Sequence, residues 1–398
     1  MSIPAVDTPQ TFAPELRIPF NRPGGGTNEA KYLAEALASG SRCGDGPFTR
    51  RCQAVLEAVS SAHRALLTTS CTDALELSAL LLRLVPGDEV VVPSFTFVST
   101  ANAFALHGAR IVFCDIRPDT LNLDERLLPG LIGPRTRAVV VVHYAGVACE
   151  LDEIMEICRR FDLALIEDNA HGLFGAYKGR PLGSFGALAT QSFHETKNMS
   201  CGEGGALLIN DPGLLGRAEI LREKGTDRAR FFRGEVDKYT WVDLGSSFLP
   251  SDLLAAVLLA QFDDREYIQH RRQAIVQRYR AELSLWAAVA GVALPVVPLG
   301  CVPAWHMFYL LMPDLATRQA LIAHLKSHGI TAVFHYVPLH SSPMGQRLGG
   351  HVGQCPVTEQ ISDRLVRLPL FNGMTDAELT RVIAMVQSFR SPLDAGCI

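Results

Sequence analysis

The sequence predicts an α/β protein with a large doubly wound sheet and a smaller C-terminal α+β domain. From Arg50 to about Asp211, short apolar runs alternate with amphipathic, helix-like segments. Each run is apolar throughout, as expected for strands of a parallel sheet whose two faces are both covered by helices. Regular alternation of such strands and helices is typical of a doubly wound sheet.

Four helix–strand pairs carry this pattern. In chain order they are Cys71–Leu84 with Glu89–Val92, Ser99–His107 with Arg110–Asp115, Asp124–Ile132 with Ala138–Val142, and Leu151–Phe161 with Leu163–Asp168. Two more apolar runs, Ala187–Phe193 and Ala206–Asn210, flank a segment that ends in a glycine cluster. Turns rich in glycine and proline separate several of these elements, which supports the boundaries.

The last third of the chain has a different character. A helix-like segment from Ser251 to about Leu285 follows a polar, arginine-rich stretch, and proline and glycine concentrate at 294–303 before further strand and helix signals. We place a domain boundary near residue 265, which gives a large domain at 19–265 and a C-terminal domain at 266–398. Residues 1–18 are interpreted as a loose N-terminal extension.

Composition excludes several classes of function. Hydrophobic residues make up 48% of the 398 and charged residues 20%, as in a globular enzyme. The net charge of -4 offers no basic field for nucleic acid, and no apolar stretch of about 20 residues could span a membrane. The N-terminus lacks the pattern of a signal peptide. Ten cysteines without a CxxC pair indicate reduced thiols in a cytoplasmic protein and no metal site.

Lys197 lies between two apolar strands, in the segment QSFHETKNMSCGEGG. A buried ammonium is costly unless it is paired or neutralised. A lysine that forms a Schiff base with an aldehyde cofactor such as pyridoxal phosphate would explain this position. The alternative interpretation is a lysine on a surface loop.

An aspartate at an earlier strand end supports the cofactor interpretation. Ligands of open α/β sheets bind at the carboxyl ends of strands, and Asp168 ends the strand Leu163–Asp168. Its carboxylate could pair with a pyridinium nitrogen and keep the cofactor ring an electron sink. The alternative is an aspartate that caps the next turn.

Other residues could complete such a site. Thr72 and Asp73 open an apolar helix, whose N-terminal N–H groups could hold a phosphate, and Ser192 could add its hydroxyl. The alternative for this stretch is an ordinary N-cap. Phe97 and His171 could lie against the two faces of the cofactor ring; the alternatives are a core aromatic and a hydrogen-bonded structural histidine.

With Asp168, Ser192, His194 and Lys197 in place, the chain resembles the DegT/DnrJ/StrS family of sugar aminotransferases from Ile18 to Phe389. The resemblance rests on the stretches CGDGPFTRRCQ, PSFTFVSTANAF, VVHYAGVACE, SFHETKN, FFRGEVDKYTW and AVFHYVPLH. It implies the type I fold of pyridoxal phosphate (PLP)-dependent transferases, typified by aspartate aminotransferase, with pyridoxal 5'-phosphate as cofactor.

The resemblance also implies roles for individual residues. Lys197 would carry the cofactor and move the proton, Asp168 would pair with the ring nitrogen, and His194 would flank the substrate sugar. The other implied cofactor contacts are Thr72, Asp73, Phe97, His171 and Ser192. The family's asparagine from the partner subunit, in a Gly-Tyr-Asn-Tyr-Arg motif, corresponds here to Ser247, so the resemblance implies a homodimer with shared active sites.

The implied reaction transfers the amino group of L-glutamate to C4 of a nucleotide-linked 4-keto-6-deoxyhexose. The most similar branch converts dTDP-4-keto-6-deoxyglucose to dTDP-4-amino-4,6-dideoxygalactose. Arginines at 222–233, Arg228 among them, would hold the pyrophosphate, unless they form a solvated charged loop. Tyr336 and His340 are candidates for the sugar pocket. The remaining alternatives are a 3- or 4-aminotransferase of other stereochemistry, a dehydratase (against which Lys197 counts) and a non-catalytic sensor of the same fold.

Overall fold

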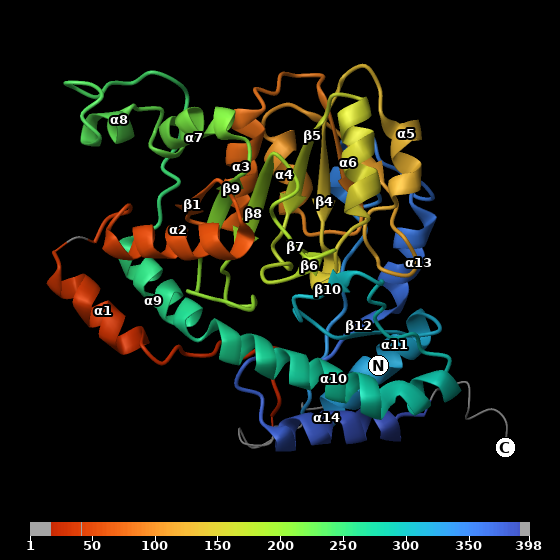
Figure 1. The fold of residues 1–398 in the computed structure, drawn as a ribbon. Coiled ribbons are helices and arrows are strands. Elements are labelled where there is room, and N and C mark those ends of the chain that lie inside the picture. Colours follow the sequence, from red (N-terminus) through yellow and green to blue (C-terminus); the bar gives the residue numbers. More distant parts are fainter. Residues whose placement is uncertain (1–16, 41, 391–398) are drawn as a thin grey trace, which may run out of the picture.

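The computed structural model describes residues 17–40 and 42–390, and its centre is a seven-stranded sheet (Figure 1). Across the sheet the strands are β1 (Arg64–Thr68), β9 (Gly205–Ile209), β8 (Leu188–Ser192), β5 (Ala164–Asp168), β4 (Thr136–Val142), β2 (Glu89–Pro93) and β3 (Arg110–Cys114). Strand β9 runs antiparallel to β1 and β8, whereas β8, β5, β4, β2 and β3 are parallel. The sheet is therefore mixed, because the β8–β9 connection holds no crossover helix that would return the chain in parallel.

Helices cover both faces of this sheet, as the apolar strands predicted. One face packs against α3 (Cys71–Leu81), α4 (Ser99–Ala105) and α7 (Leu215–Arg222). The other packs against α2 (Pro47–Ser60), α5 (Leu128–Leu131), α6 (Leu151–Arg160) and α9 (Asp252–Asp263). The helix α1 (Glu29–Ala38) lies outside α9, and α8 (Arg228–Phe232) follows α7 at the edge of the sheet (Figure 1). Short 3₁₀ helices occupy Glu125–Leu127, Tyr144–Gly146 and Pro212–Leu214.

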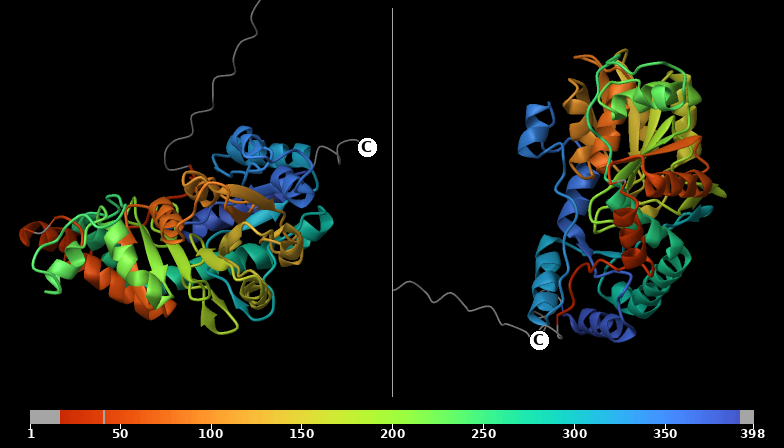
Figure 2. Two further views of the ribbon diagram at one scale, coloured as in Figure 1. Left: turned by 90° about the horizontal axis from the view of Figure 1, so that it is seen from above. Right: turned by 90° about the vertical axis from the view of Figure 1, so that its left-hand side faces the viewer.

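The last third of the chain forms a second hydrophobic core at one end of the sheet (Figure 2). The core includes residues of α10 (Arg265–Val289), β11 (Tyr309–Leu311), α11 (Leu315–Ser327), β12 (Leu365–Arg367) and α14 (Asp376–Ser388). The same third of the chain also forms α12 (Pro343–Arg347) and α13 (Pro356–Arg364). The segment predicted as one helix is divided at Asp264 into α9 and α10. Ile18 is 2% exposed and bridges Ile330, so it belongs to this core and not to a loose extension. Residues 1–16 of that predicted extension lie outside the described residues.

Several contacts hold the last third of the chain against the sheet, and two of them lie close to the strand ends. The strand β10 (Cys301–Val302) joins β6 (Ala176–Tyr177) and β7 (Arg180–Pro181) in a small antiparallel sheet. A hydrophobic cluster joins Phe95 and Tyr144, from loops at the strand ends, to Met307 and Tyr309. Side chains from the last third are thereby brought to the carboxyl ends of the parallel strands. None of the helices among the described residues is long and apolar enough to cross a membrane.

The cysteines of the described chain are free thiols. Most are buried or half-buried, as predicted, but Cys43 is exposed. Cys397 lies outside the described residues.

Candidate active site

A cavity of about 610 Å³ lies between the carboxyl ends of the parallel strands and the last third of the chain. Many of the predicted site residues line it: Thr72, Phe97, Asp168, His171, Ser192, His194, Lys197 and Tyr336. They come from α3, from the loops after β2, β5 and β8, and from the segment before α12. The fold therefore gathers into one cavity residues that are more than 250 positions apart in the chain.

Lys197 lies in the turn after β8, where its backbone N–H donates to the carbonyl of His194 over 2.9 Å. Burial lowers the pKa of its ammonium to about 8, although the nearby Cys71 and Asp168 act in the opposite direction. Lys197 forms no ion pair within the described part of the chain. A lysine with such a pKa releases its proton near neutral pH and becomes a nucleophile or a base.

Asp168 ends β5 and is 5% exposed. Its Oδ2 accepts a hydrogen bond from the Thr100 hydroxyl over 2.7 Å, and Oδ1 accepts one from the N–H of Ala170 over 3.3 Å. Burial raises the pKa of the carboxyl, and these hydrogen bonds and Lys197 offset part of that rise. Both local donors are neutral, so the negative charge of Asp168 remains available to a cation that enters the cavity.

The N-terminus of α3 offers the cavity a seat for an anion. Ser70 caps the helix by accepting from the N–H of Asp73 over 3.0 Å, and the hydroxyls of Thr72 and Ser99 are 2.8 Å apart. Gly205 makes this arrangement possible, because a Cβ at its position would lie 2.3 Å from the backbone of Ser70. The polar groups of Asp73 already have local partners. Its carboxylate accepts a hydrogen bond from the Thr69 hydroxyl, and its N–H donates to the Ser70 hydroxyl.

Three neutral histidines border Lys197. The rings of His171 and His306 stack with centroids 4.3 Å apart, and His335 lies 6.3 Å from His171. Burial, reinforced by neighbouring positive groups, holds the pKa of all three well below the ordinary value. The Nδ1 atom of His171 is buried without a hydrogen-bond partner among the described residues. This nitrogen is therefore left without a protein partner and is open to a hydrogen bond from a bound group or a water.

Arg367, at the end of β12, also lines the cavity. Its Nη1 is 3.2 Å from Nε2 of His335 and its guanidinium lies over the ring of Phe20, but its buried Nε has no partner in the described chain. Burial lowers the pKa of this group from its ordinary value. A buried guanidinium without a carboxylate partner favours an anionic ligand.

These residues fit PLP. Lys197 would carry the aldehyde, Asp168 would meet the ring nitrogen, the α3 N-terminus with Ser192 would hold the phosphate, and His171 has an unused nitrogen for the ring. When bound, the cofactor supplies an electron sink that stabilises negative charge on the substrate carbon.

Four predicted residues lie outside this cavity. Asp73 is one, since its polar groups are satisfied locally, and the exposed Ser247 lies in the loop before α9. His340 is 0% exposed, and its ring bonds to Ser94 over 2.6 Å and to Glu359 over 2.8 Å, so this geometry does not support a contact with a sugar. Arg228 pairs with Glu223 and lines a different cavity of about 570 Å³.

Comparisons with known proteins identify the family. Residues 24–387 match the model of the DegT/DnrJ/EryC1/StrS aminotransferase family. The chain belongs to this family. It is similar to the aminotransferase TlmJ from Streptoalloteichus hindustanus, with 32% identity, a TM-score of 0.84, and 94% of this chain and 97% of that one covered.

Two further structures extend the comparison. The PLP form of the putative sugar aminotransferase Spr1654 from Streptococcus pneumoniae is 26% identical, with a TM-score of 0.86 and coverage of 94% of this chain and 98% of that one. A 3-amino-5-hydroxybenzoic acid synthase is 25% identical, with a TM-score of 0.81 and coverage of 92% and 98%. As a DegT/DnrJ/EryC1/StrS family member, the chain is a PLP-dependent aminotransferase of the type I fold.

Several residues that line the cavity were not predicted from the sequence. These are Ser70, Ser99, Thr100, His306, His335 and Arg367. Ser70 stands two residues before the predicted Thr72, and Ser99 and Thr100 stand in the quoted stretch PSFTFVSTANAF with the predicted Phe97, so extending those two predictions along the chain would have included them. His335 stands directly before the predicted Tyr336 in AVFHYVPLH, which was a signal for it. His306 and Arg367 lie in no recognised motif, and only tertiary packing brings them to the strand ends.

Proposed function

We propose that the chain transfers the amino group of L-glutamate to C4 of a nucleotide-linked 4-keto-6-deoxyhexose. The specific reaction we propose converts dTDP-4-keto-6-deoxyglucose to dTDP-4-amino-4,6-dideoxygalactose. The main support is Lys197, with a pKa of about 8, in one cavity with Asp168. Spr1654, a putative sugar aminotransferase, supports a sugar as the amino acceptor.

Arg367 supports an amino acid as the donor. Arg367 lines the cavity that contains Lys197, and its buried Nε has no hydrogen-bond partner among the described residues. A guanidinium binds a carboxylate through paired hydrogen bonds. We assign Arg367 to the carboxylate of L-glutamate. Tyr336 and His194, which line the same cavity, are then left for the sugar.

We further propose that two subunits share the active sites, in the cytoplasm. At the end of α8 and in the loop from α8 to α9 the chain exposes large apolar side chains: Phe232 is 70% exposed, Trp241 74% and Leu244 65%. An apolar surface of this kind is typical of a subunit interface. Ser247 follows directly in the chain, which supports its proposed contact with the partner's cofactor phosphate. Trp241→Glu should convert the dimer to a monomer in sedimentation experiments, whereas Leu299→Glu, at a fully exposed loop position, should leave it dimeric.

One reaction tests the proposed function. The purified protein is mixed with PLP, L-glutamate and dTDP-4-keto-6-deoxyglucose, and the sugar product is analysed by mass and by proton couplings. An axial amino group at C4 supports the proposal. An equatorial amino group, or one at C3, would assign a different stereochemistry or position, and no product despite formation of 2-oxoglutarate would exclude this sugar. The neighbouring 3-amino-5-hydroxybenzoic acid synthase makes a non-sugar acceptor the second candidate.

A further inference from the structure

Directly before Asp168 in β5, the side chain of Glu167 is completely buried. It is 0% exposed, and it does not line the cavity. Successive residues of a strand point to opposite faces of the sheet, so Glu167 extends away from the cavity that Asp168 enters. The two neighbouring carboxylates therefore have different environments and different tasks.

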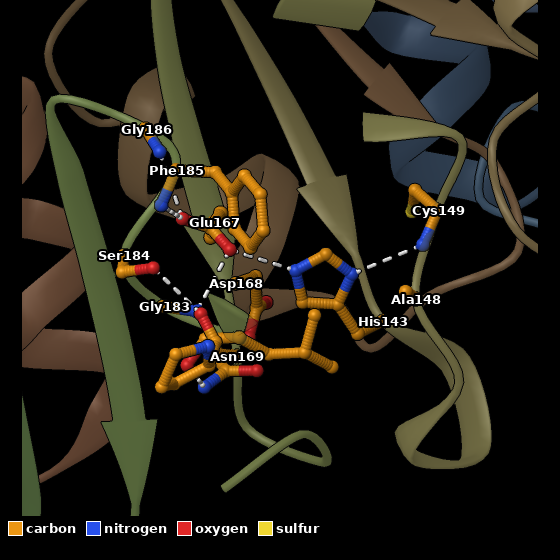
Figure 3. Close-up of polar contacts among 12 residues, drawn as sticks. His143, Ala148, Cys149, Glu167, Asp168, Asn169, Gly183, Ser184, Phe185 and Gly186 are labelled. Atoms are coloured by element: carbon orange, nitrogen blue, oxygen red, sulfur yellow. Dashed lines mark hydrogen bonds and ion pairs between the residues drawn. The ribbon is translucent and has the colours of Figure 1, made fainter. Parts of the chain in front are cut away.

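Four hydrogen bonds hold the Glu167 carboxylate (Figure 3). Oε1 accepts from the N–H groups of Phe185 over 2.6 Å and Gly186 over 2.8 Å, and Oε2 accepts from Gly183 over 2.8 Å. The fourth partner is Nε2 of His143 at 3.0 Å. Burial alone would raise the pKa of Glu167, but the hydrogen bonds from His143 and the backbone outweigh it and lower the pKa. Glu167 is therefore a buried anion.

The partners of His143 determine where its proton lies. The ring is 0% exposed, and its Nδ1 accepts a hydrogen bond from the N–H of Cys149 over 3.3 Å. Since Nδ1 uses its lone pair there, the proton is on Nε2 and is donated to Glu167. The pair consequently combines a neutral imidazole with a carboxylate and carries a net charge of -1.

This pair joins the strands that carry the cofactor residues. His143 follows β4, whose last residue, Val142, lies beside Asp168 in the sheet. The segment 183–186, which Glu167 holds, leads into β8 and so to Ser192 and Lys197. Gly183 has a φ of +93°, which favours glycine and lets its N–H point at the carboxylate.

We propose that Glu167 and His143 are positioning residues for the cofactor site. They hold the ends of β4 and β5 and the start of β8, so that Asp168 and Lys197 keep a fixed separation. The buried negative charge behind Asp168 also favours a protonated nitrogen on the cofactor ring. The proposal depends on PLP as the cofactor, and not on the proposed donor or sugar.

Asp115 provides a matched control for a purely structural role. It is 7% exposed and, like Glu167, its carboxylate accepts four hydrogen bonds: from the N–H of Ile116, from the N–H of Val357, and from the N–H and hydroxyl of Thr358. It ties β3 to α13 and does not line the cavity. Asp115→Asn should therefore destabilise the fold without acting on the cofactor.

The test compares Glu167→Gln, His143→Leu, His143→Gln and Asp115→Asn with the wild type. We measure the thermal midpoint of the apoprotein, the Kd of PLP from quenching of the protein's fluorescence, and the pH midpoint of the bound cofactor's absorbance. Glu167→Gln and His143→Leu should weaken PLP binding about tenfold or more, since each removes a charge-assisted hydrogen bond. His143→Gln, which keeps an N–H donor, should recover part of the loss.

The three measurements distinguish an effect on the cofactor site from an effect on the stability of the fold. We expect Glu167→Gln to shift the absorbance midpoint to lower pH, because a negative charge is lost, and Asp115→Asn to change only the thermal midpoint. If Glu167→Gln and Asp115→Asn lower the thermal midpoint equally and neither changes PLP affinity or the absorbance midpoint, the proposal is wrong.

A measurement on the wild type needs no variant. In a long-range ¹H–¹⁵N spectrum of protein labelled at histidine nitrogens, the ring of His143 should carry its proton on Nε2, because Nδ1 accepts from the N–H of Cys149. A proton on Nδ1 would overturn the assignment.

Discussion

Two cavities of similar size, about 610 and 570 Å³, differ in how their cations are held. In the second, most arginines pair with carboxylates: Arg64 with Glu57, Arg222 with Asp45, Arg228 with Glu223 and Arg233 with Glu219. In the first, Lys197 and Arg367 form no ion pair with any described residue. The first cavity has fewer cations than the second, but its cations, Lys197 and Arg367, are available to a ligand.

Whether the cations of a cavity are paired with carboxylates says more about its ability to bind an anion than the number of those cations. An anion that binds Arg64, Arg222, Arg228 or Arg233 in the second cavity must displace a carboxylate, so little free energy is gained. In the first cavity, the folded protein already bears the free-energy cost of burying the cations of Arg367 and Lys197. An anion bound to Arg367, or a Schiff base formed by Lys197, would offset part of that cost. The basic residues at 222–233 were a plausible anion site in the sequence, but in the structure of one subunit nearby carboxylates neutralise their charges.

The largest expected effect comes from Lys197. Lys197→Ala should reduce amino transfer at least about 10³-fold, since it removes both the nucleophile and the base. It should also abolish the absorbance of the covalently held cofactor. Single-turnover formation of 2-oxoglutarate measures the loss. Retention of more than a tenth of the activity would contradict the assignment.

The next effect distinguishes the two cavities. Arg367→Met should raise the KM for L-glutamate about 10- to 100-fold, because a charge-assisted contact to the carboxylate is lost, with little change in the KM for the sugar. Arg228→Met is the matched control and should leave the KM for L-glutamate within about twofold. The reverse order of effects would show that the second cavity binds the donor.

A pH titration examines the unpaired lysine directly. The modification of Lys197 in the apoprotein by an amine-reactive reagent, followed by mass spectrometry, should rise with pH with a midpoint at about 8, because only the neutral amine reacts. The exposed Lys326 serves as the internal reference for the reagent. Equal pH dependence of the two lysines would show that burial does not lower the pKa of Lys197.

The smallest effect is expected for the paired arginines. Arg233→Gln should change the free energy of unfolding by less than about 1 kcal/mol, because Arg233 and its partners Glu219 and Glu235 form exposed or half-exposed ion pairs. Urea unfolding at low and high salt measures this. A loss well above 1 kcal/mol would mean that this cavity is a structural centre.

The positions of most strands, and the cover of the sheet by helices on both faces, followed from the sequence where segments were long and periodic. The helix predicted at Asp124–Ile132 was less successful, because a 3₁₀ turn at Glu125–Leu127 and the single-turn α5 occupy this stretch. Pro129 lies at the start of α5 and has no N–H to donate to the preceding turn, so the two turns do not form one helix. The antiparallel direction of β9 was also missed, because an apolar run has no direction by itself.

Within the site, local motifs identified Lys197, Asp168 and Ser192, because each follows a recognisable strand. Arg367 and His306 could not be found in this way, since neither lies in a motif and both reach the cavity through the second core. Conversely, His340 stands in a suggestive stretch, FHYVPLH, yet its ring bonds to Ser94 and Glu359 in the interior. Whether such a residue faces the cavity or is bonded in the interior depends on its hydrogen-bond partners, and these cannot be read from the sequence.

The most direct test of the unpaired-cation site is a crystal structure of the PLP-loaded protein soaked with 2-oxoglutarate. We predict that a carboxylate of 2-oxoglutarate lies on the guanidinium of Arg367, in the cavity of Lys197, and that Arg222, Arg228 and Arg233 keep their ion pairs. A 2-oxoglutarate bound among those arginines, with Arg367 free of ligand, would contradict the account.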